Sequence, residues 1–135
     1  MNAQVNSQEF AYTTESNKSV DDTTVALLKA TEQKGGWTIF QVYDIQERLA
    51  AKGFTHTPLK IIEICSAKYA SQFLKDDLLT SLCMPCKINA YQDGERVLIA
   101  LMKPSIVTQF FPNTNSEKAL QAEKELIEII ENSLK

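Results

Sequence analysis

Two cysteines three positions apart are the feature of this sequence best suited to chemistry. They belong to the segment Cys83-Met84-Pro85-Cys86, and a third cysteine, Cys65, lies upstream. A Cys-x-x-Cys pair can form a short-range disulfide or bind a soft metal ion. In thioredoxin-like proteins such a pair begins a helix, whose N-terminus lowers the thiol pKa. Here the pair comes just before a predicted strand, so this contribution to thiol reactivity is missing.

A metal site is a second interpretation of the cysteines. The histidine and cysteine residues of the chain are His56, Cys65, Cys83 and Cys86. Together they could form a Cys₃His zinc site, although structural zinc sites usually bring two closely spaced ligand pairs and this chain has one. Copper(I) bound by two thiolates beside Met84 is also compatible with the residue types. The competing interpretation is structural, because free cysteine packs as a small buried hydrophobe.

Other catalytic arrangements have little support in the sequence. A single histidine leaves no Ser-His-Asp set that can be defended. Gly35 and Gly36 follow a predicted helix and precede a strand, which is the reverse of the order in a phosphate-binding loop. Lys68 and Tyr69 begin a helix and could bind an anion at its N-terminus; the alternative is an ordinary first turn with Tyr69 in the core. We therefore assign no catalytic residue and no cofactor, and favour a protein that is not an enzyme.

Length and composition indicate one globular domain. The 135 residues suffice to bury about two thirds of the surface of the unfolded chain. With 14 basic and 17 acidic residues, the net charge of −3 opposes general nucleic-acid binding, which needs a basic surface. No apolar run approaches the roughly 20 residues of a membrane helix, and the first ten residues do not form a signal peptide. Three cysteines, an odd number, oppose a secreted disulfide framework, so a complete chain is expected to be cytoplasmic.

The apolar pattern predicts the elements that position these residues. Strands are expected over residues 10–15, 37–43, 59–65, 86–91 and 96–102. Asp93-Gly94 predicts a hairpin between the last two strands. The residues suited to cap helices are Ser19, Asp44, Ser66, and either Asn115 or Ser116. Because 59–65 and 97–102 are apolar on both faces, these two strands should lie inside the sheet.

This order of elements predicts an α+β fold with two layers. One sheet of about five strands should carry helices mainly on one face. Residues 1–8 are expected to be a flexible N-terminus, residues 9–135 the single domain, and residues 76–81 a connector. The apolar face of the last helix is predicted at Leu120, Ile127, Ile130 and Leu134. Its glutamates are expected on the opposite, solvated face.

Several segments resemble the domain of unknown function 302 family. The specific ones are Ile64–Ala70, Met84–Ile88 and Tyr91–Gly94, and the more generic ones are Gln33–Trp37, Val42–Asp44 and Leu49–Gly53. The resemblance covers about residues 9–133 and implies a small α+β domain that pairs as a homodimer, with no established reaction. It places the family's cysteine segments at Cys65 and Cys86. The chain departs from the family at Ser66-Ala67, where Asn-Pro is common, and Cys83 is not a typical family position.

Two hypotheses follow from these residues. The first is a homodimer that binds a small ligand or a protein partner without catalysis, and that binds neither nucleic acid nor a membrane. Its candidate ligand-binding residues are Cys65, Lys68, Tyr69, Pro85 and Cys86. The final helix and the β-hairpin are the surfaces expected to pair. The second hypothesis is a thiol-based redox or soft-metal-binding protein that uses Cys65, Cys83 and Cys86.

Overall fold

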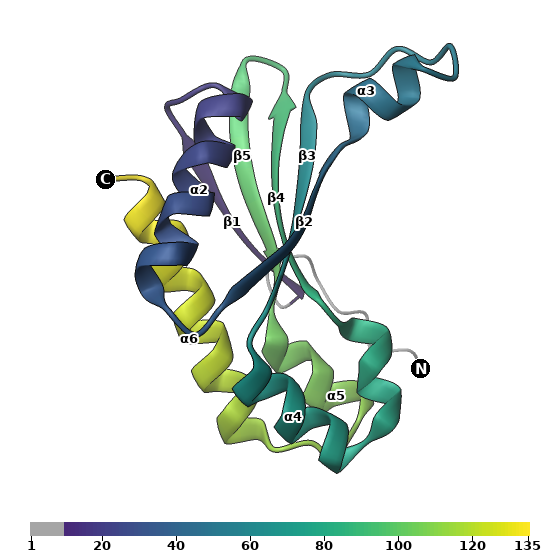
Figure 1. Cartoon of the computed structure of the whole chain (residues 1–135), viewed down its shortest axis with the longest axis vertical. Coiled ribbons are helices and arrows are strands. Elements are labelled where there is room, and N and C mark those ends of the chain that lie inside the picture. The colour runs from purple at the N-terminus through teal and green to yellow at the C-terminus, as the bar shows by residue number, and fades with distance from the viewer. Residues whose placement is uncertain (1–9) are drawn as a thin grey trace, which may run out of the picture.

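The strands form one antiparallel sheet in the order β1-β5-β4-β3-β2. A computed structural model describes residues 10–135 (Figure 1), so the expected flexible segment 1–8 lies outside the described residues. The strands are β1 (Ala11–Ser16), β2 (Thr38–Asp44), β3 (Leu59–Cys65), β4 (Cys86–Asp93) and β5 (Arg96–Met102). The bounds of β3 and β5 are the predicted ones. Both strands have a neighbour on each side, as their apolar character on both faces indicated.

One face of the sheet is buried because alternate residues of its inner strands are apolar. The buried positions of β3, β4 and β5 are Ile62, Ile64, Ile88, Ala90, Val97, Ile99 and Leu101. Ile88 pairs with Ile62 on one side and with Leu101 on the other, so the buried side chains lie in continuous rows. The alternate residues of the same strands point the other way. We call this second surface the open face; at its centre lie Leu59, Ile61, Asn89, Leu98 and Ala100.

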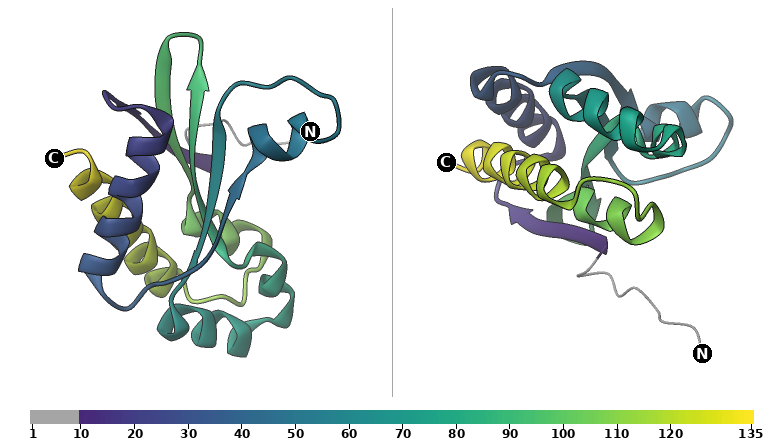
Figure 2. Two further views of the ribbon diagram at one scale, coloured as in Figure 1. Left: turned by 45° about the horizontal axis from the view of Figure 1, so that its top comes forward. Right: turned by 90° about the horizontal axis from the view of Figure 1, so that it is seen from below.

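Two long helices, α2 (Val20–Lys34) and α6 (Ser116–Ser133), pack side by side over the buried face (Figures 1 and 2). Both begin at predicted caps. Ser19 Oγ accepts a hydrogen bond from the backbone N–H of Asp22 at 3.0 Å, and Asn115 Oδ1 accepts one from Lys118 at 2.9 Å. The predicted α+β fold, with helices mainly on one face of a five-stranded sheet, is therefore confirmed.

The buried face of α6 agrees with the predicted one at Ile130, and Ile127 and Leu134 pack against the core, but it differs at Leu120. Leu120 is 56% exposed, whereas the buried residues of the helix are Ala119, Ala122, Leu126, Ile129, Ile130 and Ser133. Two alanines lie on the inward face at the start of the helix, where α6 packs closely against the segment that follows β5. The prediction at Leu120 was wrong because the helix presents Ala119 and Ala122, not the leucine, to the core in its first turns.

Four short helical segments gather at one end of the sheet, the lower end in Figure 1. They are α4 (Ala67–Asp76), η1 (Leu78–Cys83, a 3₁₀ helix), η2 (Pro104–Ile106, also 3₁₀) and α5 (Val107–Phe110). The prediction of a plain connector over 76–81 was wrong, since Asp77 accepts a hydrogen bond from the N–H of Leu79 at 2.9 Å and begins η1. Ser66 lies at the N-cap position of α4, but its side chain makes no capping hydrogen bond.

The opposite end of the sheet carries the predicted β4–β5 hairpin and the short helix α3 (Ile45–Ala50). Gly94 has a φ of +62°, which a side chain would disfavour, so the hairpin depends on glycine at this position. Asp44 caps α3 as expected by accepting a hydrogen bond from the N–H of Glu47 at 3.0 Å. Ile45 and Leu49 of this helix are half-buried. Within residues 10–135, none of the helices combines the length and apolar character needed to cross a bilayer.

Candidate functional site

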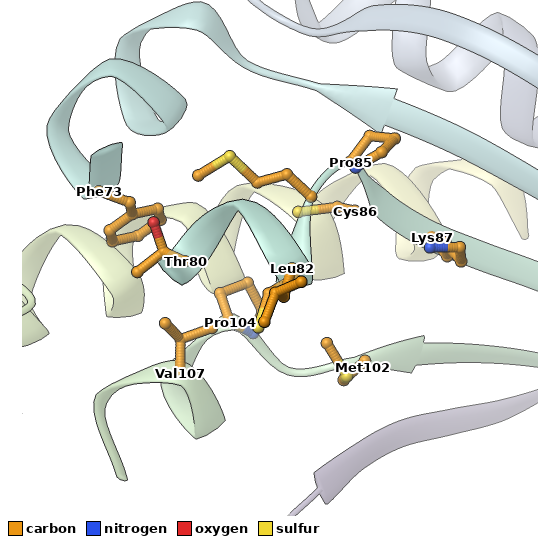
Figure 3. Close-up of a pocket in the computed structure, with 11 residues that line it drawn as sticks. Phe73, Thr80, Leu82, Pro85, Cys86, Lys87, Met102, Pro104 and Val107 are labelled. Carbon is orange, nitrogen blue, oxygen red and sulfur yellow. The ribbon is translucent and has the colours of Figure 1, made fainter. Parts of the chain in front are cut away.

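A cavity of about 260 Å³ lies where the four short helical segments meet the sheet (Figure 3). We call it the Cys86 pocket. It is lined by Phe73, Thr80, Leu82, Cys83, Met84, Pro85, Cys86, Lys87, Met102, Pro104 and Val107. These residues come from α4, η1, β4, β5, η2 and α5, so the pocket forms only when the whole end of the molecule is assembled. Its walls are mainly apolar, which is typical of a small-molecule site.

Four of the lining residues carry sulfur: Cys83, Met84, Cys86 and Met102. The first three are consecutive or nearly so in the chain. Met102 comes from the end of β5, which pairs with β4 so that Leu101 lies opposite Ile88. Sequence analysis missed Met102 because its proximity to the cysteines depends on which strands are neighbours. A correct strand order would have been the signal needed to find it.

Lys87 is the charged member of the pocket lining. Its side chain is 50% exposed, and its Nζ lies 3.9 Å from the Oε2 of Glu63, near the limit of an ion pair. Glu63 is held from the other side by Tyr43, whose hydroxyl donates a hydrogen bond to Oε1 at 2.8 Å. In Figure 3, Lys87 lies at the periphery of the lining residues, beyond Cys86. The pocket thus combines an apolar interior with one cationic group at its edge.

A second, narrower crevice of about 30 Å³ adjoins the Cys86 pocket. Cys65, Tyr69 and Cys86 line it, together with Trp37. Cys86 borders both spaces, and Ile64 of β3 pairs with Cys86 of β4. The candidate residues therefore divide into two groups. Pro85 and Cys86 line the larger pocket, whereas Cys65 and Tyr69 line only the crevice.

Tyr69 is a core residue that also belongs to a polar cluster. It is 4% exposed, and its hydroxyl donates a hydrogen bond to Oε2 of Glu125 on α6. Trp37 donates from Nε1 to Oε1 of the same carboxylate at 3.1 Å, and its ring lies 5.9 Å from that of Tyr69. Burial and the bond to Glu125 raise the pKa of Tyr69 to about 12. Lys68 lies over the Tyr69 ring at 5.2 Å and lines neither cavity.

Glu125 was expected on a solvated helix face, and the structure corrects that expectation. Its partners, Trp37 and Tyr69, are 88 and 56 residues away in the sequence, so no local pattern indicates the cluster. A glutamate on a helix normally points to solvent. Here it joins α6 to α4 and to the segment that precedes β2.

All three cysteines are free thiols whose pKa lies above the ordinary value of 9.0. Burial raises the pKa of Cys65, and also that of Cys83, where the charge of Lys87 opposes it. Burial raises the pKa of Cys86 to about 12, with a further contribution from the neighbouring Cys65. Because the thiolate is the nucleophile, these thiols are poorly reactive at neutral pH.

His56 lies away from the cysteines. It is exposed on the loop after α3, where its Nδ1 lies 2.6 Å from the carbonyl oxygen of Thr57. Among residues 10–135, no three histidine, cysteine, aspartate or glutamate side chains come together as a group that could hold a metal ion. The structure therefore does not assemble the four-ligand set of His56, Cys65, Cys83 and Cys86.

Comparison with known proteins agrees with the fold described above. A crystal structure of an uncharacterized conserved protein DUF302 from Bacillus stearothermophilus is similar, with a TM-score of 0.83 and 26% sequence identity. The similarity covers 91% of this chain and 97% of that chain. No curated protein matches this chain. The family model for the domain of unknown function DUF302 matches residues 12–133, and the chain therefore belongs to that family.

Proposed function

We propose that this protein is a homodimeric binding domain whose Cys86 pocket holds a small ligand without catalysing a reaction. The observation that carries the proposal is the pocket itself, an apolar space of about 260 Å³ bordered by six elements. Typical drug-sized sites have roughly 300–1,000 Å³. The expected ligand is therefore a small molecule with an apolar body rather than a cofactor or a nucleotide.

The protonation states of the lining residues support binding rather than catalysis. Cys83 and Cys86 have raised pKa values and remain thiols at neutral pH. A general base needs a pKa near the working pH and a position within hydrogen-bond reach of the proton that it removes. Lys87, a cation, supplies neither a base nor a thiolate, so the lining favours holding a ligand over transforming it.

A neutral apolar probe tests ligand binding directly. We expect 1-octanol to shift the backbone NMR signals of residues lining the Cys86 pocket, such as Thr80 and Val107. Met102→Asp puts a carboxylate into the half-buried wall and should weaken octanol binding at least about fivefold. Leu28→Asp, a matched change at a half-buried position on α2, should leave the affinity within about twofold. Shifts spread over the surface, or an unchanged affinity in folded Met102→Asp protein, would contradict the proposal.

The homodimer is proposed to form through the open face of the sheet, with a second copy of this chain as the occupant. The final helix, first considered for this role, buries its apolar side in its own core. The open face has half-buried apolar residues around Asn89, whose Oδ1 is buried and has no hydrogen-bond partner among residues 10–135. An Asn side chain both donates and accepts, so the same residue of a two-fold-related copy can satisfy the amide once it turns outward from the sheet.

Charge on the open face is compatible with self-pairing. Lys87 and Glu63 form one opposite-charge pair toward one end of the face, and Arg96 and Glu15, 3.2 Å apart, form another toward the other end. In each of these two pairs a positive side chain is balanced by a neighbouring negative one, so a second copy does not face a surface of like charge. The interface would then have an apolar centre and a charged rim, which is common in protein interfaces.

Soft-metal binding is the second candidate function, favoured by the four sulfur-bearing residues of the Cys86 pocket. Copper(I) accepts two or three sulfur ligands, and thioethers can supply one of them. Anaerobic titration with Cu(I) against a chromophoric chelator tests this candidate. If this candidate function is correct, Cu(I) should bind tightly to wild-type and Cys65→Ser protein, and the tight binding should be lost in Cys83→Ser and Cys86→Ser proteins. The related thiol redox hypothesis has less support, because all three thiols have raised pKa values.

A further inference from the structure

We propose that the ligand of the Cys86 pocket is a small amphipathic carboxylate, whose apolar body fills the pocket and whose single negative charge pairs with Lys87. This inference rests on the proposed binding function and adds the chemical class of the ligand. It follows from the composition of the lining, in which the uncharged residues surround the interior and the one charged side chain, a cation, lies at the edge.

Lys87 is available for such a contact. Its ammonium carries three N–H donors, and among residues 10–135 its only charged neighbour within ion-pair distance is Glu63 at 3.9 Å. An ion pair of this length with a 50% exposed lysine contributes at most a small stabilisation. The flexible side chain can therefore turn toward a ligand while keeping its apolar stem against the pocket wall.

Glu63 would remain in place when Lys87 turns. Its Oε1 accepts the hydrogen bond from Tyr43 at 2.8 Å, and only 16% of its side chain is exposed. The carboxylate of Glu63 therefore stays as a fixed negative neighbour of the Lys87 ammonium. A ligand with more than one negative charge would be repelled by it, whereas a monoanion can share the ammonium.

The size and charge of the site restrict the ligand class further. A phosphate monoester carries between one and two negative charges at neutral pH and is usually bound by several donors or cations. The lining of this pocket supplies one cation and no second charged group. A carboxylate matches that single charge, and the apolar walls match a short alkyl or aromatic body.

Octanoate and 1-octanol form a matched pair of probes, because they share a chain length and differ in head-group charge. Both are titrated at pH 7 into wild-type protein, Lys87→Met and Lys75→Met. Methionine keeps an unbranched apolar stem without the ammonium. Lys75 is an exposed lysine in the last turn of α4 that does not line the pocket, so it serves as the control.

Lys87→Met should weaken octanoate binding by roughly three- to tenfold and leave octanol binding within about twofold. Lys75→Met should change neither affinity. Added salt should weaken octanoate binding to wild-type protein and not octanol binding, since exposed charge pairs are screened. If octanol binds at the pocket but octanoate binding does not depend on Lys87, the carboxylate inference is wrong and the binding function stands. If neither probe binds at the pocket, both proposals fail.

Discussion

Cys86 shows how the surroundings of a residue decide its chemistry. In the sequence it is half of a Cys-x-x-Cys pair, a pattern compatible with redox or metal chemistry. In the fold it begins an interior strand and borders two cavities, and burial raises its pKa to about 12. A neutral thiol of this kind is a poor nucleophile, and in the proposed ligand site it would form part of the wall.

The raised pKa of Cys86 predicts a loss of stability at alkaline pH. The unfolded thiol releases its proton near pH 9, whereas the native thiol keeps it until about pH 12. Between these values the unfolded state binds fewer protons, so the free energy of unfolding falls by up to about 1.4 kcal/mol per pH unit for this group. Urea denaturation at pH 8, 9, 10 and 11 should show the decrease begin near pH 9.

Cys86→Ala provides the comparison for this pH dependence. Without the thiol, the decrease between pH 9 and 11 should become shallower, while Tyr69, whose pKa is also raised to about 12, still contributes above pH 10. Identical slopes in wild-type and Cys86→Ala protein would show that the thiol is not protected from deprotonation in the native state.

Residue-level prediction from sequence succeeded where chemistry is carried by the residue type and failed where it depends on distant neighbours. The cysteines were singled out by type, and Cys65 and Cys86 do line one crevice. Lys87 and Glu125 were missed because exposed lysines and helical glutamates are common, and their partners here come from other elements. The features that distinguish these two residues are tertiary. An apolar cavity lies beside Lys87, and two aromatic hydrogen-bond donors surround Glu125.

At the scale of elements, the Tyr69–Glu125–Trp37 cluster ties α4 and α6 to the start of β2. Tyr69→Phe removes the hydroxyl that donates to the carboxylate and should lower the free energy of unfolding by about 1–3 kcal/mol. Tyr43→Phe is the matched control, because Tyr43 also donates to a glutamate but lies on the less buried side of the sheet. Urea denaturation at pH 7 should give the larger loss for Tyr69→Phe; an equal or larger loss for Tyr43→Phe would contradict this role of the cluster.

The orientation of α6 makes a second element-scale prediction. Leu126 is 0% exposed and Leu120 is 56% exposed, although both are leucines on the same helix. Leu126→Ala should cost about 2–5 kcal/mol because it leaves a cavity in the core, whereas Leu120→Ala should change stability by no more than about 0.5 kcal/mol. Chemical denaturation of the two variants measures the difference. Comparable losses, or a larger loss for Leu120→Ala, would contradict this orientation of α6.

The elements themselves were largely predictable because they follow local rules. Short apolar runs without alternation located β3 and β5, Asp93-Gly94 located the hairpin, and Ser19 and Asn115 were recognisable caps. The helical end that forms the Cys86 pocket was less predictable. Three of its four segments, η1, η2 and α5, are six residues or shorter, and the end as a whole depends on contacts between parts of the chain far apart in sequence. Local propensity carries little information about such segments.

For the whole molecule, the two proposed sites lie on connected surfaces. Lys87 and Met102 line the Cys86 pocket, and both residues belong to the side of the strands that forms the open face. A dimer centred on Asn89 would therefore have the pockets near its rim. Ligands could enter from the edge of the interface without separating the two copies.

The proposed dimer gives the last prediction. Sedimentation of wild-type protein should return twice the chain mass of 15.2 kDa. Asn89→Asp keeps the shape of the side chain and would bring two carboxylates together at the two-fold axis, so it should shift the equilibrium to monomer because like charges facing each other repel. Gln33→Arg, an exposed change on α2, should leave the dimer intact. Asn89 lies at the centre of the open face, and its Oδ1 has no hydrogen-bond partner within residues 10–135. Two results would therefore rule out this face as the interface. One is a wild-type protein that is monomeric at all concentrations, and the other is a folded Asn89→Asp protein that stays dimeric.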